Sequence, residues 1–296
     1  MTLDLDTPEG GRPLAAPVTR RGFAALVGAA GFAAAVGPAA ASAIKTDEAG
    51  LVTEAARIPV GDTDLPAYIA RPDGAGPFPV VLVVHEIFGV HEYIRDTARR
   101  FAKEGYFALV VDLYARAGDP SAMTDWDEIG RIVRTATHTQ VMRDLSRSVD
   151  WLAETRPDAD TGALAVTGFC WGGAVTWMFS AHDPRVKAGA AWYGRLVDPG
   201  PGRFSAGMQR PWPVDVADRL NGPVLGLYGG QDRGIPVTDV ETMRTALKKA
   251  GGPSSIVLYD DAPHGFHADY RASYREQAAQ NAWSRALAWF RQYGVG

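Results

Sequence analysis

The hexapeptide GFCWGG at positions 168–173 constrains the fold of this chain more than any other feature, because it surrounds one reactive residue with glycines. A short apolar, β-prone run over 163–167 precedes it and residues 174–180 can form a helix, so the hexapeptide is predicted to lie at a strand-to-helix turn. Glycines let the backbone turn sharply there and lift the central side chain above the sheet. Cys170 is the only cysteine of the chain, and this pattern indicates a nucleophile. The alternative is a buried, inert cysteine, which is what a lone cysteine usually is.

Two further reactive residue types follow strands later in the chain. The apolar run 223–228 is followed by Asp232, and the run 255–259 is followed by His264, which lies between a proline and a glycine on a turn. Taken singly, such an aspartate is most often a turn former and such a histidine is most often structural. Together with Cys170 they stand in the order nucleophile, acid, histidine, which is the order of α/β-hydrolases. We therefore predict a catalytic set of these three residues, with Asp232 orienting the imidazole of His264.

From about Glu54 to Tyr293 the chain resembles the dienelactone hydrolase family of α/β-hydrolases, also called carboxymethylenebutenolidases. Generic serine esterases share the fold and the order of the triad, whereas a cysteine elbow together with His-Glu-Ile-Phe-Gly is the narrower signature. The resemblance implies hydrolysis of a lactone or ester through a Cys-His-Asp triad and a thioester acyl-enzyme, with no cofactor. It rests on the elbow at 168–173 and on four other motifs, which are His85-Glu86-Ile87-Phe88-Gly89-Val90, Asp112-Leu113-Tyr114, Gly230-Gln231-Asp232 and Pro263-His264-Gly265-Phe266.

The resemblance also implies roles for residues near the nucleophile. Glu86 falls inside a matched motif, and its carboxylate is expected near the resting cysteine, where it regulates when the thiol becomes a thiolate. The alternative for Glu86 is a surface carboxylate at the start of a helix, where the helix dipole favours it. The backbone N–H groups of Ile87 and Trp171 are the expected oxyanion hole, because this fold uses the residue after the nucleophile and one in the loop after an earlier strand.

Substrate contacts are predicted less directly. Family members that act on dienelactone hold its carboxylate with arginines, one of them soon after the catalytic histidine, but here that position is occupied by the run 267–269 (His-Ala-Asp). Arg271 is the nearest arginine beyond it and is the candidate for this contact. Tyr193 matches a tyrosine of the family pocket at a strand end, although ordinary packing explains it equally well. Tyr114, in the motif after the second apolar strand, is a third candidate.

Alternating strands and helices predict an α/β fold with a mostly parallel central sheet and helices on both faces. A chain of 296 residues has room for one large core, so we expect a single α/β-hydrolase domain over 44–296. The expected central strands are 79–85, 107–113, 163–168, 186–192, 223–229 and 255–259, after an antiparallel hairpin over 58–70. The expected helices are 93–104, 140–155, 174–180, 237–250 and 273–292.

Residues 1–43 have a different character. Thr19–Phe23 contains a pair of arginines, a mildly apolar Ala/Gly-rich run follows to Ala40, and Ala41-Ser42-Ala43 resembles a cleavage site. This pattern predicts a twin-arginine export signal that is removed, so that the export machinery is a partner and the protein works in the periplasm or outside the cell. A transmembrane helix is the alternative, but several glycines and a proline interrupt the apolar run.

Charge and motifs argue against several other function classes. The formal net charge is −4, and no basic stripe or polybasic anchor indicates a nucleic acid or a membrane surface as a partner. The other histidines lack metal-ligand spacing, so no metal site is expected. Besides a lactone hydrolase, two interpretations stay open: an exported general esterase or thioesterase without lactone preference, and a non-catalytic protein of the same fold that binds a small molecule.

Overall fold

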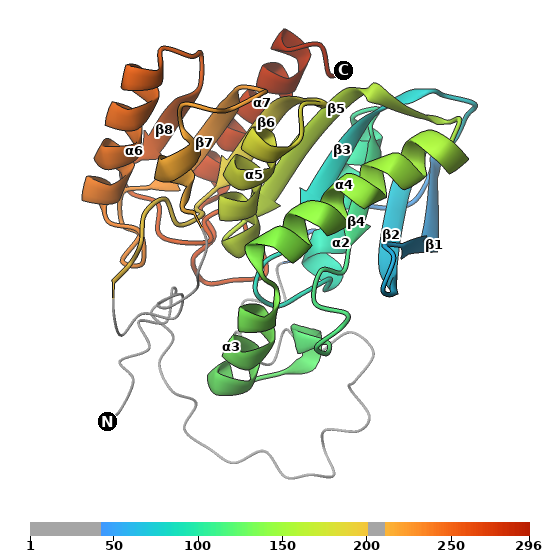
Figure 1. Cartoon of the computed structure of the whole chain (residues 1–296), viewed down its shortest axis with the longest axis horizontal. Coiled ribbons are helices and arrows are strands. Elements are labelled where there is room, and N and C mark those ends of the chain that lie inside the picture. Colours follow the sequence, from blue (N-terminus) through green and yellow to red (C-terminus); the bar gives the residue numbers. More distant parts are fainter. Residues whose placement is uncertain (1–42, 201–210) are drawn as a thin grey trace.

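The computed structural model describes residues 43–200 and 211–296, and within them eight strands form one sheet in the order β1-β2-β4-β3-β5-β6-β7-β8 (Figure 1). The hairpin of β1 and β2 is antiparallel, β2 pairs antiparallel with β4, and every later pairing is parallel. The strands are β1 Leu51–Pro59, β2 Asp64–Pro72, β3 Phe78–Val84, β4 Phe107–Val111, β5 Ala159–Phe169, β6 Val186–Trp192, β7 Val224–Gly229 and β8 Ser255–Tyr259.

Helices cover both faces of this sheet, and Figure 1 shows α4 and α5 in front of it and α7 behind it. The helices of the described residues are α2 Glu92–Lys103, α3 Trp126–Thr135, α4 His138–Thr155, α5 Trp171–His182, α6 Val237–Ala250 and α7 Glu276–Gln292, with short 3-10 turns at η2 Pro120–Ala122 and η3 Pro213–Val216. The predicted α/β-hydrolase fold is confirmed.

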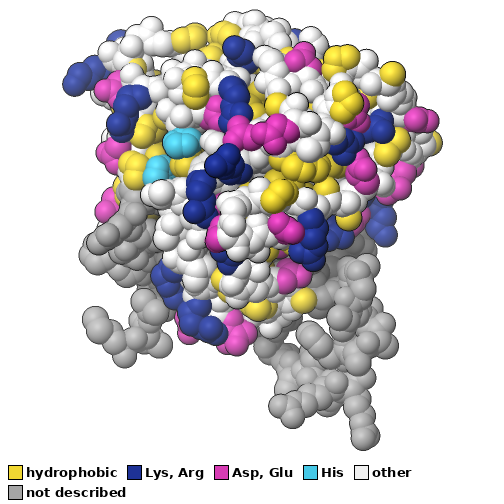
Figure 2. Space-filling model, turned by 45° about the vertical axis from the view of Figure 1, so that its right-hand side comes forward, with side chains coloured by type: hydrophobic (Ala, Val, Ile, Leu, Met, Phe, Trp, Pro, Cys, Tyr) yellow, Lys and Arg dark blue, Asp and Glu magenta, His cyan; other side chains and the backbone are white. Residues whose placement is uncertain are grey.

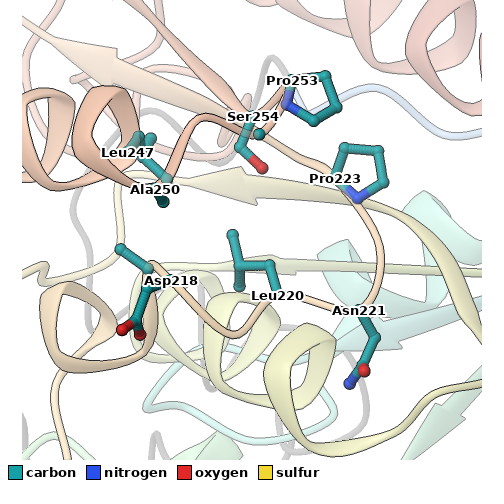
Figure 3. A pocket seen from close by; sticks show the side chains of 10 residues that line it. Asp218, Leu220, Asn221, Pro223, Leu247, Ala250, Pro253 and Ser254 are labelled. Atoms are coloured by element: carbon teal, nitrogen blue, oxygen red, sulfur yellow. The ribbon is translucent and has the colours of Figure 1, made fainter.

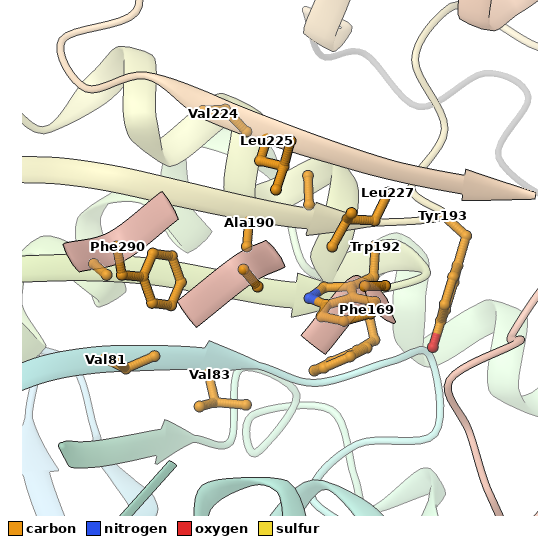
Figure 4. Packing of buried hydrophobic residues seen from close by; sticks show 14 of the residues in the cluster. Val81, Val83, Phe169, Ala190, Trp192, Tyr193, Val224, Leu225, Leu227 and Phe290 are labelled. Atoms are coloured by element: carbon orange, nitrogen blue, oxygen red, sulfur yellow. The ribbon is translucent and has the colours of Figure 1, made fainter. Parts of the chain in front are cut away.

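The core consists of two apolar layers, one on each face, because alternate residues of a strand point to opposite sides. Val81 and Val83 of β3 belong to the layer that holds α2 and α7, whereas Leu82 belongs to the layer that holds α4 and α5. Figure 4 shows the first layer, which runs from Phe290 of α7 to the aromatic ring of Phe169 at the end of β5. The central strands are apolar on both sides for this reason, as expected of a covered parallel sheet.

Several predicted bounds are correct and others need correction. Strands 186–192 and 255–259 and helix 237–250 match the structure. The last helix begins at Glu276 rather than at 273, because the preceding segment turns back, with the Arg275 N–H donating to the Phe266 carbonyl at 2.9 Å. Helix α3 was not predicted; its first turn is capped by the Asp125 carboxylate, which accepts from the N–H groups of Asp127 and Glu128.

The parallel strands bring their carboxyl ends to one edge, where five of the candidate residues lie. Glu86 follows β3, Cys170 follows β5, Tyr193 follows β6, Asp232 follows β7 and His264 follows β8. This edge is where ligands bind in open α/β sheets. The predicted export signal over 1–43 lies outside the described residues except for its last residue. Among the helices that the structure describes, none combines the length and the apolar character that a membrane crossing requires.

Candidate active site

Cys170 sits on a strained turn between β5 and α5. Its backbone has φ 54° and ψ −115°, in a region that non-glycine residues rarely adopt. Such strain costs on the order of 1–3 kcal/mol and persists only where the surroundings enforce it. Here the Cys170 N–H donates to the carbonyl of Trp192 at 3.0 Å, which ties the elbow to the end of β6.

The elbow glycines are required by close backbone approach. A Cβ on Gly168 would lie 2.3 Å from the carbonyl oxygen of Gly172, and one on Gly172 would lie 2.4 Å from the carbonyl oxygen of Val84. Gly173 is equally confined, because its Cβ would lie 2.3 Å from the Trp192 carbonyl oxygen. The hexapeptide thus packs backbone against backbone, which holds the cysteine in its strained conformation.

His264 and Asp232 form a buried pair. His264 Nδ1 lies 2.7 Å from Asp232 Oδ2, and both residues are 5% exposed. The other carboxylate oxygen, Oδ1, accepts from the backbone N–H groups of Gly234 at 2.8 Å and Ile235 at 3.0 Å. These contacts fix the carboxylate and leave Nδ1 as the protonated nitrogen of a neutral imidazole.

The second imidazole nitrogen is directed to the cysteine. His264 Nε2 has no hydrogen-bond partner among the described residues that meets ordinary geometry, yet the ring interacts with the Cys170 sulfur. Burial disfavours the imidazolium, but the negative charges of Asp232 and Cys170 outweigh it and raise the pKa of His264 well above its usual value. The arrangement therefore favours a proton on the imidazole of His264.

Glu86 is fully buried, so the alternative of a surface carboxylate is wrong. Its Oε2 accepts from the hydroxyl of Tyr270 at 2.7 Å and lies 3.2 Å from Nε2 of His91. Its Oε1 has no hydrogen-bond partner among the described residues. The carboxylate thus keeps one oxygen uncommitted.

Arg271 belongs to the cluster around Glu86. The side chain is 4% exposed, its Nε donates to the Tyr270 hydroxyl at 2.5 Å, and its Nη2 lies 3.6 Å from Glu86 Oε2. The guanidinium also stacks over the Phe88 ring at 5.0 Å. Burial lowers the pKa of Arg271 to about 9, while the neighbouring carboxylate works against loss of charge, so the guanidinium stays protonated at neutral pH.

The two candidate tyrosines are buried against different parts of the site. Tyr193 has φ 37° and its ring meets the His264 ring edge-on, with centroids 5.1 Å apart. Burial raises the pKa of Tyr193 well above its usual value, and the charges of Tyr93, Glu86 and Cys170 raise it further, so this phenol stays protonated. Figure 4 shows Tyr193 just beyond the end of β6, next to Trp192.

Tyr114 lies on the other side of the elbow. Its ring packs against His85 at 4.6 Å and against Trp171 at 5.0 Å. Burial lowers the pKa of His85 to about 4, so this ring is neutral, and its Nδ1 donates to the carbonyl of Glu86 at 2.7 Å. These rings form the wall next to the loop that carries Ile87.

The expected oxyanion donors are available. Trp171 is the first residue of α5, so its backbone N–H has no acceptor within the helix. Ile87 follows Glu86 in the loop after β3, and its N–H makes no backbone hydrogen bond with another described residue. Ile87 lies in the loop after β3 and Trp171 begins the helix after β5, and these two strands pair in the middle of the sheet.

Sequence reasoning missed several residues of this region. Tyr270 and His91 contact Glu86, and Arg195 donates from Nη1 to the carbonyl of Gly234 in the loop of the acid at 2.9 Å. Arg195 carries a signal that could have found it, because it follows a strand end by three residues. Tyr270 carries none, since nothing in its neighbourhood marks a contact 184 residues away in the chain.

One cavity lies away from these residues, at the opposite edge of the sheet. Figure 3 shows a cavity of about 160 Å³ before β7 and β8, lined by Leu220, Pro223, Leu247 and Ser254 among others. It opens at the amino ends of these strands, opposite to the edge that carries Asp232. The face in Figure 2 mixes acidic and basic side chains without a single-sign patch in its described part. Within the described ranges, no group of three or more His, Cys, Asp or Glu residues is arranged so that it could hold a metal ion.

Known proteins that are similar to this chain in sequence or in structure have names that agree with one another. A protein of Methylorubrum extorquens named "Putative carboxymethylenebutenolidase" is 52% identical over 257 residues, which is 86% of each chain. A protein of Escherichia coli K12 with the same name is 46% identical over 257 residues, covering 86% of this chain and 92% of that one. A crystal structure from Klebsiella pneumoniae, described as a "Putative Dienelactone Hydrolase", has a TM-score of 0.77 and 47% identity, and the match covers 82% of this chain and 99% of that chain.

A family model covers most of the same region. Residues 65–294 match the model described as "Dienelactone hydrolase family". The match spans the sheet from β2 onward and reaches beyond the end of α7. The chain therefore belongs to the dienelactone hydrolase family and is a carboxylic ester hydrolase with the α/β-hydrolase fold.

Proposed function

We propose that this protein hydrolyses a lactone or carboxylic ester through Cys170, His264 and Asp232, with a thioester acyl-enzyme as intermediate. One observation carries the proposal: a cysteine on a strained elbow interacts with an imidazole whose Nδ1 is held by a buried carboxylate at 2.7 Å. Nucleophile, base and orienting group are the three parts that covalent acyl transfer needs.

In the first step the Cys170 thiolate attacks the carbonyl carbon of the substrate. The C–S bond forms, the C–O bond to the leaving alkoxide breaks, and the imidazolium of His264 gives its Nε2 proton to that alkoxide. For a lactone the alkoxide stays attached to the acyl group, so the ring opens. Asp232 stabilises the imidazolium between these events and keeps Nδ1 protonated throughout.

In the second step water hydrolyses the thioester. His264, now neutral, takes a proton from water as its oxygen attacks the carbonyl carbon, and collapse of the tetrahedral intermediate releases the carboxylic acid and the Cys170 thiolate. The N–H groups of Trp171 and Ile87 stabilise the oxyanion in both steps. Loss of one such donor typically costs about 10²–10³ in rate.

We further propose that Glu86 regulates the charge of the resting nucleophile. Its Oε2 is committed to Tyr270 and His91, whereas Oε1 has no partner among the described residues. Glu86 and Cys170 both act on the Tyr193 phenol, which places that ring in the field of the two groups. A thiol can donate to the uncommitted oxygen until substrate displaces it.

A second candidate function is ester hydrolysis without preference for lactones. Arg271, the predicted contact for a substrate carboxylate, is buried and hydrogen-bonded to Tyr270 beside Glu86. An arginine committed in this way favours a site that accepts esters without an acidic substituent. Such a site would hydrolyse short p-nitrophenyl esters at least as well as dienelactone.

The test compares the purified full chain with Cys170→Ala on dienelactone and short p-nitrophenyl esters. We expect the wild type to be active and the variant to retain the fold but lose activity, and we expect mass spectrometry of the wild type to find the acyl group on the single cysteine. A ranking of the two substrate types by kcat/KM decides between the two candidates. If neither substrate is turned over, or if the variant matches the wild type, the protein uses the site for binding or for other chemistry.

We also propose that the protein is exported through the twin-arginine route and acts in the periplasm or outside the cell. The support is the arginine pair within Thr19–Phe23 and the Ala-Ser-Ala sequence at 41–43. Cell fractionation tests this: replacing Arg20 and Arg21 with lysine is expected to retain the protein in the cytoplasm. Equal export of both forms would contradict the proposal.

A further inference from the structure

The turn after β6 joins the cysteine elbow to the neighbouring strand. The Tyr193 N–H donates to the Leu227 carbonyl of β7 at 2.9 Å. Gly194 packs directly on the first turn of α5, because a Cβ there would lie 2.1 Å from the backbone nitrogen of Ala174. Both contacts are made by backbone, so the next residue, Arg195, starts from a fixed position.

The Arg195 side chain reaches the loop that carries the acid. Its Nη1 donates to the carbonyl oxygen of Gly234 at 2.9 Å. The N–H groups of Gly234 and Ile235 donate in turn to Asp232 Oδ1 at 2.8 and 3.0 Å, and Oδ2 of the same carboxylate holds His264 Nδ1 at 2.7 Å. A continuous path of hydrogen bonds therefore connects Arg195 with the imidazole.

Arg195 also differs from other half-buried arginines in how its charge is balanced. Arg100 and Arg116 each form ion pairs with aspartates, whereas Arg195 forms none with a described carboxylate. Burial lowers the pKa of Arg195, and the negative charges of Cys170 and Asp232 work against this shift. Coulomb interaction is mutual, so the guanidinium stabilises negative charge on the sulfur.

We propose that Arg195 is a positioning residue for the nucleophile and its base, which fixes the loop of Asp232 through Gly234 and contributes positive charge to the electrostatic field at Cys170. The role rests on the proposed function, because it concerns the same sulfur and imidazole. It predicts an effect on the rate of the chemical step and on the charge felt at the sulfur, and little effect on the binding of a neutral ester.

The test uses Arg195→Met and Arg195→Lys in the full chain, with Arg233→Met as the matched control. Arg233 is an exposed cation of the acid loop, adjacent to Asp232 in sequence. With a neutral p-nitrophenyl ester we expect Arg195→Met to lower kcat by about tenfold or more, as for loss of a group that orients or stabilises charge in an active site, with KM within about twofold. Arg195→Lys should recover most of the loss, and Arg233→Met should behave as wild type.

A second readout does not depend on turnover. Cys170 is the only cysteine, so alkylation reports on its sulfur alone, and the ratio of the rates for iodoacetate, an anion, and iodoacetamide, a neutral reagent, measures the local charge. Arg195→Met is expected to lower this ratio by about threefold or more, because a positive charge near the sulfur is lost. A purely structural role would change both rates together.

Three outcomes would overturn the inference. They are an unchanged kcat in folded Arg195→Met, a ratio equal to that of the wild type, and an increase of KM confined to carboxylate-bearing esters with unchanged kcat. The last result would make Arg195 a substrate contact. If the wild type hydrolyses no ester, the proposed function fails, but the alkylation ratio still decides whether Arg195 sets the charge at the sulfur.

Discussion

Replacing Asp232 with asparagine is expected to remove most activity while the loop keeps its shape. Asparagine has nearly the size of aspartate, and its amide oxygen can accept the two backbone hydrogen bonds from Gly234 and Ile235 that Oδ1 accepts at 2.8 and 3.0 Å. The amide nitrogen then faces His264 Nδ1 at the position of Oδ2, now 2.7 Å away. Because an amide nitrogen is a donor, Nδ1 must become the acceptor and the ring must carry its proton on Nε2.

A ring protonated only on Nε2 is unable to take the proton of the Cys170 thiol. The same change removes the negative charge that helps to raise the pKa of His264. When the acid of a Ser-His-Asp triad is replaced in this way, kcat falls by about 10⁴, which corresponds to about 5 kcal/mol of transition-state stabilisation. We expect a loss of about 10³–10⁴ here, slightly smaller because a thiol is more acidic than a serine hydroxyl and depends less on its base.

The assay is kcat/KM for a short p-nitrophenyl ester across neutral and alkaline pH. Activity of Asp232→Asn should return in part at alkaline pH, where hydroxide deprotonates the thiol without help from the imidazole. Asp261→Asn, at an exposed position three residues before His264, is the control for loss of one negative charge. A folded Asp232→Asn variant with nearly wild-type kcat/KM at neutral pH would refute the tautomer argument.

Three further predictions concern stability, each read by urea unfolding. Gly194→Ala should cost more than about 3 kcal/mol or prevent folding, because the new Cβ would lie 2.1 Å from backbone, whereas Gly252→Ala, with nothing within 4 Å, should be nearly neutral. His85 has its pKa lowered to about 4, so the unfolded chain binds the extra proton and the wild type should lose up to about 3 kcal/mol as pH falls from about 6.5 to 4; His85→Gln should lose less. Tyr270→Phe should cost about 1–3 kcal/mol, because it removes the 2.7 Å hydrogen bond to the buried Glu86 carboxylate.

Strand ends could be predicted from the sequence because they carry two independent signals. A short apolar run predicts the buried strand, and a reactive or turn-forming residue directly after it predicts the edge of the sheet. Asp232 and His264 were found in this way, and their side chains lie 2.7 Å apart although 32 residues separate them. Parallel strands made this meeting predictable, since they bring their carboxyl ends to one edge.

Helix α3 was missed although its signals were present. Asp125 is a typical N-cap residue, and Ile129, Ile132 and Val133 recur at helical spacing on the buried face. The segment follows a glycine- and proline-containing stretch after β4. A cap and three apolar positions in ten residues are a weak signal unless tertiary contacts are known, because a helix of this length depends on packing for most of its stability.

Two of the missed residues share a physical property: each donates a hydrogen bond to a predicted site residue or to the loop that carries one. Tyr270 donates to Glu86, and Arg195 donates to the carbonyl of Gly234. A carboxylate in a buried motif requires donors, but any hydroxyl, guanidinium or backbone N–H that reaches it can serve, so the requirement does not select a residue type. Which donor lies within hydrogen-bond distance of the carboxylate depends on the tertiary structure.

Arg271 shows what this means for a residue role that is inferred from a family motif. Its position after the histidine motif suggested a substrate contact, yet its charge is placed 3.6 Å from Glu86 and its Nε is used by Tyr270. Candidate reacting groups can therefore be proposed from the sequence, because their chemistry demands particular atoms. Their charge environment has to be derived from the structure, because a cation near a carboxylate can neutralise that carboxylate as readily as it can bind an incoming anion.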